Sequence, residues 1–263
     1  MRNGNSWKFG GSKRAMKYPM KNTAFTGEQY RSLYPDGSDG HYWVATRNKI
    51  INYFLHSTIK KSGRILEIGC GRGTVVKYLR SKGDDCWGCD LASVKPVDDA
   101  GDFCLYGIDF SEINTEFRMS IETVLLLDVI EHIENDTFFL KRVKGAFPNL
   151  KNLLLTVPAR KELWSNYDEY NGHYRRYDME SLTNVVREGG LSVISRSYFF
   201  HSLYIPAKLL SVFKKKRSTY ISSPTGLMLF LHRIISALFV LDFWLLPKKM
   251  IGTSIILSSE VVD

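Results

Sequence analysis

The chain has few cysteines and no apolar run near its start. Its four cysteines all fall within residues 70–104, and no second ligand pair accompanies Cys86 and Cys89. A structural zinc site needs four such ligands, so we expect buried, reduced thiols and no metal. The first residues also lack the apolar stretch of a secretory signal. These absences favour a cytoplasmic protein.

Acidic residues are scarce at two places in the chain. Residues 1–27 carry six Lys or Arg and no acid, and residues 203–249 carry eight against the single Asp242. The positive charge of these two segments together is larger than the net charge of the whole chain, which is +9. The rest of the chain therefore carries a net negative charge. A nucleic-acid groove across such a core is disfavoured, whereas the basic segments suit an anionic surface. Residues 1–27 show no periodicity, and we expect them to be disordered.

A glycine-rich stretch organises the rest of the chain. The apolar run 64–68 contains Glu67 and leads into glycines at 69, 71 and 73, followed by helical sequence at 75–82. This order is typical of the first half of a βαβ unit. The third glycine comes one position too early for the dinucleotide fingerprint. A carboxylate at Glu67 would repel a pyrophosphate but suit a ligand with ammonium and sulfonium charges.

Three further apolar segments end near a carboxylate. Residues 86–92, 103–109 and 121–128 read as strands that carry Asp90, Asp109 and Asp128. Open α/β sheets bind ligands at the carboxyl ends of their strands. The acidic residues therefore predict one ligand site at one sheet edge, where Asp90 can accept both hydroxyls of a ribose.

These motifs resemble those of a known family. The matching stretches are Glu67-Ile68-Gly69-Cys70-Gly71-Arg72-Gly73, Asp90, and Asp128-Val129-Ile130-Glu131-His132. They look like the motifs of class I S-adenosylmethionine (SAM) dependent methyltransferases of type 11/12. Asp168 and the run 172–177 resemble a pattern found in methyltransferases encoded alongside bacterial surface-glycan and lipid biosynthesis enzymes. The resemblance runs from about residue 42 to the end. It implies an α/β fold with a Rossmann-like, seven-stranded, mostly parallel sheet, an antiparallel last strand and helices on both faces.

The resemblance also implies a cofactor-binding set. By it, Glu67, Gly69, Gly71 and Gly73 hold the methionine end, Asp90 the ribose, Asp109 and Phe110 the adenine, and Asp128 and Val129 the sulfonium side. Cys70 and Leu91 complete the cofactor-binding set. The cofactor would be SAM and the product S-adenosylhomocysteine. The motifs do not specify the methyl acceptor.

The remaining elements follow from periodicity and capping. We expect helices at 42–58, 135–147 and 179–188, and strands at 151–157, 191–199 and 253–258. The first helix would cover the cofactor or pack its aromatic residues in the core. Asn135 or Asp136 would cap the second, whose inward residues would be Phe138, Phe139, Leu140 and Val143.

An aromatic and charged loop at 164–177 follows the fifth strand and would lie beside the donor methyl. An oxygen or nitrogen acceptor must lose a proton, and His173 in this loop and His132 after the fourth strand are the candidate bases. The candidate substrate-binding residues are Trp164, Asp168, Tyr174, Arg175 and Arg176. Paired arginines suit a phosphate or carboxylate. Alternatively, Asp168 pairs with the arginines and pins the loop.

A long insertion, about 200–252, precedes the last strand. Its segment 226–246 is apolar except for a stripe of His232, Arg233 and Ser236, with Asp242 off to one side. Ionisable groups and the return of the chain to the sheet disfavour a membrane span. A helical hairpin docked on an anionic membrane surface through residues 203–249 is one interpretation. Packing on the domain or on another subunit is the other.

The sequence therefore predicts a SAM-dependent methyltransferase domain at 28–263. It would methylate oxygen or carbon of a small-molecule, glycan or lipid-linked acceptor in the cytoplasm, peripherally on the inner face of the cell membrane if the insertion docks there. The sequence leaves open whether the protein forms a homo-oligomer. An inactive methyltransferase-like binding module is an alternative that the intact acidic set argues against. An NAD-dependent enzyme is another, which Glu67 and Thr74 disfavour.

Overall fold

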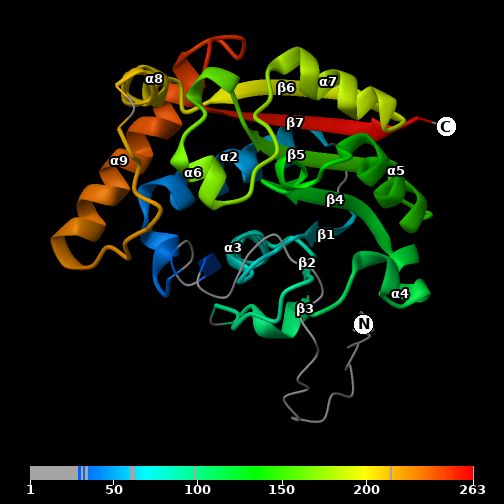
Figure 1. Ribbon diagram of the computed structural model, residues 1–263. Coiled ribbons are helices and arrows are strands. Elements are labelled where there is room, and N and C mark those ends of the chain that lie inside the picture. The colour runs from blue at the N-terminus through cyan, green and yellow to red at the C-terminus, as the bar shows by residue number, and fades with distance from the viewer. Residues whose placement is uncertain are drawn as a thin grey trace.

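The computed structural model describes residues 29–30, 32, 35–59, 63–97, 99–213 and 215–262. The segment predicted to be disordered, 1–27, lies outside them. The described chain forms a seven-stranded sheet in the order β3-β2-β1-β4-β5-β7-β6, with helices around it (Figure 1). The strands are β1 Arg64–Ile68, β2 Cys86–Asp90, β3 Cys104–Tyr106, β4 Ile121–Leu127, β5 Asn152–Pro158, β6 Leu191–Phe199 and β7 Ser254–Val261.

The sheet has the predicted mixed topology. Strands β1 to β5 pair in parallel, and β7 inserts between β5 and β6, antiparallel to both. The α-helices are α2 Tyr42–Thr58, α3 Thr74–Ser81, α4 Thr115–Met119, α5 Asp136–Ala146, α6 Asn166–Tyr170, α7 Met179–Glu188, α8 Tyr204–Val212 and α9 Gly226–Leu245. Short 3₁₀ turns are η1 Ser38–Gly40, η2 Gly101–Phe103, η3 Phe110–Glu112, η4 Ile130–His132, η5 Lys161–Leu163 and η6 His201–Leu203. The predicted Rossmann-like fold with helices on both faces is confirmed.

A separate hydrophobic core fills each face of the sheet. On one face, helices α4, α5 and α7 contribute Phe117, Leu140 and Val186. On the other face, α2, α3 and α9 contribute residues such as Phe54 and Val76. The central strands are apolar on both sides because both faces are covered. The predicted elements agree with the observed ones to within a few residues at their ends.

One predicted core residue is on the surface. The side chain of Asn135 caps α5 by accepting a hydrogen bond from the backbone N–H of Phe138 at 3.0 Å. Phe139, Leu140 and Val143 are buried as expected, but Phe138 is 59% exposed. Phe138 lies one residue before the inward stripe of a 3.6-residue period and therefore faces solvent.

Helix α9 of the insertion presents its polar residues inward. It packs along α2, where Thr46 Oγ1 donates to Ser236 Oγ at 3.1 Å and the Tyr42 N–H donates to His232 Nδ1 at 3.1 Å. Asp242 is buried too and accepts from the His201 N–H at 2.9 Å. The polar stripe predicted for this helix is thus its buried face, except that Arg233 is exposed. Asp242 faces η6 instead of α2.

Within the described part of the chain, α9 is the one helix whose length and composition would allow a membrane crossing. It is followed directly by the segment that leads into β7, which lies inside the sheet. Helix α8 is held elsewhere, because Ser211 Oγ donates to the Glu162 carbonyl at 3.0 Å in η5. The two helices of the insertion are therefore both anchored to the domain.

Candidate active site

The glycine-rich turn after β1 has the backbone that its sequence predicts. Gly69, Gly71 and Gly73 all have left-handed φ angles, of 75°, 53° and 78°. A Cβ at Gly69 would lie 2.9 Å from a methyl group of Val129, and one at Gly73 would lie 2.8 Å from the Cys104 sulfur. Conformation and close packing both demand glycine at these two positions.

Asp90, at the end of β2, is tied to this turn. Its carboxylate accepts hydrogen bonds from the Gly71 N–H and the Ala92 N–H, each at 2.8 Å, and from the Tyr30 hydroxyl at 3.2 Å. Burial raises the pKa of Asp90, although these donors oppose the shift. The bonds fix the carboxylate at the wall of a cavity at this edge of the sheet.

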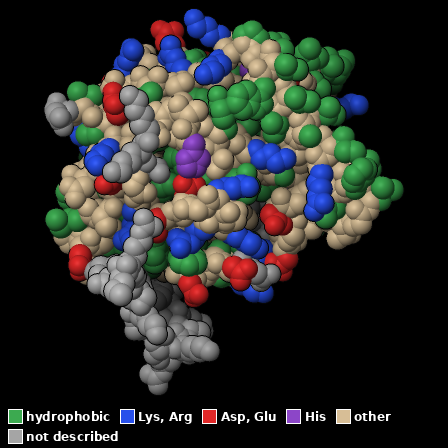
Figure 2. Space-filling model, turned by 180° about the vertical axis from the view of Figure 1, so that it is seen from behind, with side chains coloured by type: hydrophobic (Ala, Val, Ile, Leu, Met, Phe, Trp, Pro, Cys, Tyr) green, Lys and Arg blue, Asp and Glu red, His purple; other side chains and the backbone are tan. Residues whose placement is uncertain are grey.

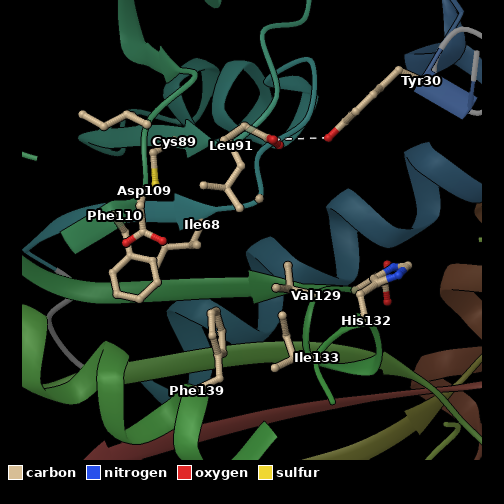
Figure 3. Close-up of a pocket in the computed structure, with 14 residues that line it drawn as sticks. Tyr30, Ile68, Cys89, Leu91, Asp109, Phe110, Val129, His132, Ile133 and Phe139 are labelled. Carbon is tan, nitrogen blue, oxygen red and sulfur yellow. Dashed lines mark hydrogen bonds between the residues drawn. The ribbon is translucent and has the colours of Figure 1, made fainter. Parts of the chain in front are cut away.

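A cavity of about 330 Å³ lies over the carboxyl ends of β1, β2 and β4 (Figure 3). It is lined by Tyr30, Ile68, Gly69, Cys89, Asp90, Leu91, Ile108, Asp109, Phe110, Asp128, Val129, His132, Ile133 and Phe139. Seven of the eleven residues predicted to bind cofactor are in this lining. The other four, Glu67, Cys70, Gly71 and Gly73, are not.

Glu67 is in β1 and only 3% exposed. Burial raises its pKa well above the usual range, and the nearby positive charge of Arg47 only partly offsets this. One of its carboxylate oxygens has no hydrogen-bond partner in the described part of the chain. Glu67 is therefore buried within β1 and is not in the lining of this cavity.

Asp109 and Asp128 lie on the cavity wall in different settings. Asp109 caps η3 through the Ser111 N–H at 2.9 Å. Asp128 has a left-handed φ of 57° and forms an ion pair of 2.7 Å with Arg47 of α2. A left-handed φ is uncommon for a non-glycine residue, although Asp adopts it more readily than most. Helix α2 thus reaches the edge of the cavity through Arg47.

A second cavity, of about 310 Å³, opens beside the first and shares Asp128 and His132 with it. Its other lining residues are His41, Tyr42, Trp43, Glu131, Pro158, Tyr167, Asn171, His173, Arg176, Arg217, Ser218, Tyr220, Ile221, Thr253 and Ser254. A ligand in each cavity would meet the other at Asp128 and His132. We refer to the first as the cofactor cavity and to the second as the acceptor cavity, after the roles predicted from the sequence for the residues that line them.

Asp168 organises the loop predicted to bind substrate. Its Oδ1 lies 2.9 Å from His173 Nδ1 and 2.8 Å from Arg176 Nε, and the residue is fully buried. Burial alone would raise the pKa of Asp168, but the hydrogen bond from His173 and the charge of Arg176 lower it to about 2. Asp168 therefore positions His173 and Arg176, as the alternative interpretation of the loop expects.

The other residues predicted to bind substrate or act as a base fall into two groups. His173 and Arg176 line the acceptor cavity, whereas Trp164, Tyr174 and Arg175 are not in its lining. Arg175 forms an ion pair of 2.7 Å with Asp136 instead. Tyr174 is 56% exposed, and its N–H donates to the Glu131 carbonyl at 2.8 Å. The loop is thereby tied to η4.

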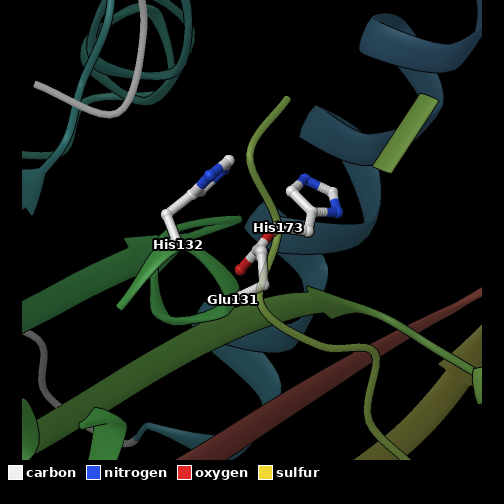
Figure 4. A group of neighbouring side chains, drawn as sticks. All are labelled: Glu131, His132 and His173. Carbon is white, nitrogen blue, oxygen red and sulfur yellow. The ribbon is translucent and has the colours of Figure 1, made fainter. Parts of the chain in front are cut away.

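Glu131, His132 and His173 converge at the junction of the two cavities (Figure 4). Burial and the neighbouring His173 lower the pKa of His132 to about 4, so its imidazole is neutral at pH 7. Burial and the charge of Asp128 raise the pKa of Glu131 well above its usual range. This junction combines two imidazoles with a buried carboxyl group.

Several lining residues were not predicted. Arg217 and Tyr220 come from the insertion, whose basic run suggested a membrane contact instead. Tyr30 lies before the recognised motifs. Arg47 is in the lining of neither cavity but reaches their edge through its ion pair with Asp128. Glu131 adjoins His132 in the quoted motif, and this was the one available signal for it.

Comparison with protein families identifies the chain. A family model described as a methyltransferase domain matches residues 42–196, more than half of the chain. The chain belongs to this family. It is a SAM-dependent methyltransferase of class I, and the NAD-dependent alternative is set aside. No curated protein matches it in sequence.

The chain is similar to several solved methyltransferase structures at low identity. The 1,6-didemethyltoxoflavin-N1-methyltransferase of Burkholderia thailandensis is 14% identical over 82% of this chain and 78% of its own, with a TM-score of 0.49. The magnesium protoporphyrin IX methyltransferase of Synechocystis is 16% identical over 89% and 93%, with a TM-score of 0.49. A putative sarcosine dimethylglycine methyltransferase from Galdieria sulphuraria is 14% identical over 87% and 91%, at 0.48.

Proposed function

We propose that this methyltransferase transfers the SAM methyl group to an oxygen of an anionic, lipid-linked acceptor at a membrane surface. One observation carries the proposal. The insertion supplies Arg217 and Tyr220 to the acceptor cavity, and its two helices expose a broad apolar surface. A single segment therefore joins the acceptor cavity to a surface suited to lipid.

The acceptor cavity has two guanidinium groups on its wall. Arg176 is committed to Asp168, but no carboxylate of the described residues lies within ion-pair distance of Arg217. Burial and the nearby charge of Arg176 lower the pKa of Arg217. The guanidinium of Arg217 suits a phosphate or a carboxylate, which favours an anionic acceptor.

Arg217 is held in place by the domain. The backbone N–H of Arg217 donates a hydrogen bond to Asn166 Oδ1 at 2.8 Å, and its backbone carbonyl accepts one from Asn166 Nδ2 at 3.0 Å. Further along, the Ile221 N–H donates to the Ser32 carbonyl at 3.0 Å. The segment between α8 and α9 thus forms one wall of the acceptor cavity and is anchored on both sides.

The exposed surface of the insertion is apolar. Figure 2 shows hydrophobic side chains gathered over α8 and α9, with Lys and Arg beside them. The largest exposed members are Ile205, Leu209, Val212, Phe213, Leu227, Met228, Phe230, Leu238, Leu241, Trp244 and Leu245. We call this set the apolar face. Such a surface on a soluble domain marks a contact with a membrane or a protein.

The surroundings of the apolar face favour a membrane. Exposed lysines adjoin it on the chain at Lys215, Lys216, Lys248 and Lys249. Lysines beside an apolar surface suit anionic headgroups, while the apolar side chains enter the lipid boundary. The inward polar stripe of α9 agrees with this, because a helix that turns His232 and Ser236 away from its outer surface is built for apolar surroundings.

Methyl transfer is an in-line displacement at carbon, so catalysis consists mainly of aligning acceptor and donor. The acceptor oxygen attacks the methyl carbon, the carbon–sulfur bond breaks, and its electrons return to sulfur. The acceptor hydroxyl must also lose its proton. His132 and His173, at the junction of the two cavities, are placed to bring about that deprotonation.

The test uses SAM labelled on its methyl group. Purified protein is incubated with labelled SAM and a lysate of the source cells, and the organic and aqueous phases are separated. We expect protein-dependent label in the organic phase. Label only in the aqueous phase would contradict a lipid-linked acceptor and leave the apolar face to pack against protein.

A further inference from the structure

We propose that Glu131, His132 and His173 bind one divalent transition-metal ion at the junction of the two cavities. One ligand atom from each residue lies within 4.8 Å of the others. Metal–ligand bonds of about 2.1 Å would draw these atoms together by roughly 1 Å, within reach of side-chain rotation. Figure 4 shows the carboxylate and both imidazoles converging. Only the ion's catalytic role rests on the proposed function.

Glu131 is the strongest indication of a missing partner. The residue has no exposed surface, and neither of its carboxylate oxygens has a hydrogen-bond partner in another described residue. Asp128 beside it is already neutralised by Arg47 at 2.7 Å. Burying a carboxylate without a partner costs free energy. A cation between Glu131 and the two imidazoles would supply that partner.

His173 is oriented as a metal ligand is. Its Nδ1 hydrogen-bonds to Asp168 at 2.9 Å, which leaves Nε2 for the junction. A carboxylate behind a histidine in this way fixes the tautomer and ring orientation of metal-binding histidines. The His132 and His173 rings stand edge to face, with centroids 4.7 Å apart. Both rings therefore face the same small volume.

The ligand set indicates the kind of ion. Two imidazoles and one carboxylate suit Mn²⁺, Fe²⁺, Co²⁺ or Zn²⁺ better than Mg²⁺ or Ca²⁺, which prefer oxygen ligands. Three protein ligands leave coordination positions open for a substrate atom. The cysteines, which gave the sequence-based expectation of no metal, take no part.

The proposed role of the ion is to bind and activate the acceptor hydroxyl. His132 lines both cavities, so an ion there contacts the acceptor beside the donor methyl. Coordination lowers the pKa of the hydroxyl, whose proton leaves to water. The oxygen then forms its bond to the methyl carbon, the carbon–sulfur bond breaks, and its electron pair neutralises the sulfonium.

The test titrates Co²⁺ into tag-free, chelator-treated full-length protein. Visible absorption reports imidazole coordination, and equilibrium dialysis gives the stoichiometry. We expect one ion per chain, with binding weakened at least 30-fold in Glu131→Gln and in His173→Asn. The matched controls are Glu134→Gln and His56→Asn, both exposed, which should bind as the wild type does. Calorimetric SAM binding shows whether each variant is folded.

The outcomes separate the two proposals. No Co²⁺ binding by the wild type, or unchanged binding in both site variants, overturns the metal site. Methyl transfer by a protein that binds no ion would leave the proposed function intact, with a histidine as direct base. Should Glu131→Gln fail to fold, His173→Asn and the wild-type stoichiometry still decide. Ion binding without label in the organic phase would instead reject the lipid-linked acceptor.

Discussion

The two cavities that meet at Asp128 and His132 are built from different kinds of sequence. The cofactor cavity lies on strand ends and a glycine turn, all within residues 30–139. The acceptor cavity draws on α2, η4, the loop after β5 and the insertion, which span residues 41–254. The difference teaches that the sheet edge fixes the donor, whereas segments far apart in sequence determine the acceptor.

Breaking the cofactor cavity should have the largest effect. Asp90→Ala removes the carboxylate that orients Gly71 and Ala92 and that we expect to accept the ribose hydroxyls. Two lost charge-assisted hydrogen bonds, at about 1.5–3 kcal/mol each, predict at least a 100-fold weaker SAM affinity by calorimetry. The exposed Asp102→Asn is the control. Wild-type affinity in Asp90→Ala would place the ribose elsewhere.

The cofactor cavity could be predicted because its signals are local. A glycine at a left-handed φ and a carboxylate at a strand end occupy fixed places along the chain. Seven of the eleven predicted residues accordingly line the cavity. Gly71 and Gly73 do not line the cavity and instead shape the turn through their conformation and packing. The motif match alone therefore did not show which of its residues contact the cavity.

The acceptor cavity could be predicted only in part. The loop at 164–177 was recognised by its composition, and His173 and Arg176 line the cavity. Whether Asp168 faced a substrate or its own arginines depended on tertiary packing, which composition does not encode. Arg217 sat in a basic run next to three lysines, and only the fold shows that it turns inward.

The Arg217→Met variant tests whether the acceptor cavity can be impaired while the cofactor cavity is left intact. The guanidinium of Arg217 lies on the acceptor cavity, 5.3 Å from the centre of the Tyr167 ring. Losing one guanidinium from an anion site should raise KM for the acceptor about 50-fold while the SAM affinity stays unchanged. Initial rates of labelled methyl transfer measure it. Arg187→Met, on the outer surface of α7, serves as the control.

A pH titration probes the residue that holds the acceptor loop. The folded pKa of Asp168 is about 2, below its usual 3.8, so its stabilisation is present above pH 4 and is lost as the pH falls towards 2. The predicted loss is roughly 2 kcal/mol of unfolding free energy. Urea unfolding across this range measures it, and Asp168→Asn should lack this component. An equal pH dependence in both proteins would refute the assignment.

The apolar face should show the smallest effect per residue. Trp244→Glu places a charge on a side chain that is 55% exposed on α9. Removing one such anchor should weaken flotation with anionic vesicles about tenfold. Met119→Glu, exposed on α4, should float as the wild type does. Equal losses in both variants would point to a general charge effect.

The central claim is that the insertion couples the membrane surface to the acceptor cavity. The most direct measurement compares labelled methyl transfer to the organic-phase acceptor when it is presented in vesicles and when it is dispersed in detergent. The doubly substituted Leu238→Glu/Trp244→Glu protein should keep its rate in detergent and lose at least tenfold in vesicles. Equal rates in vesicles for the wild type and this variant would contradict the claim.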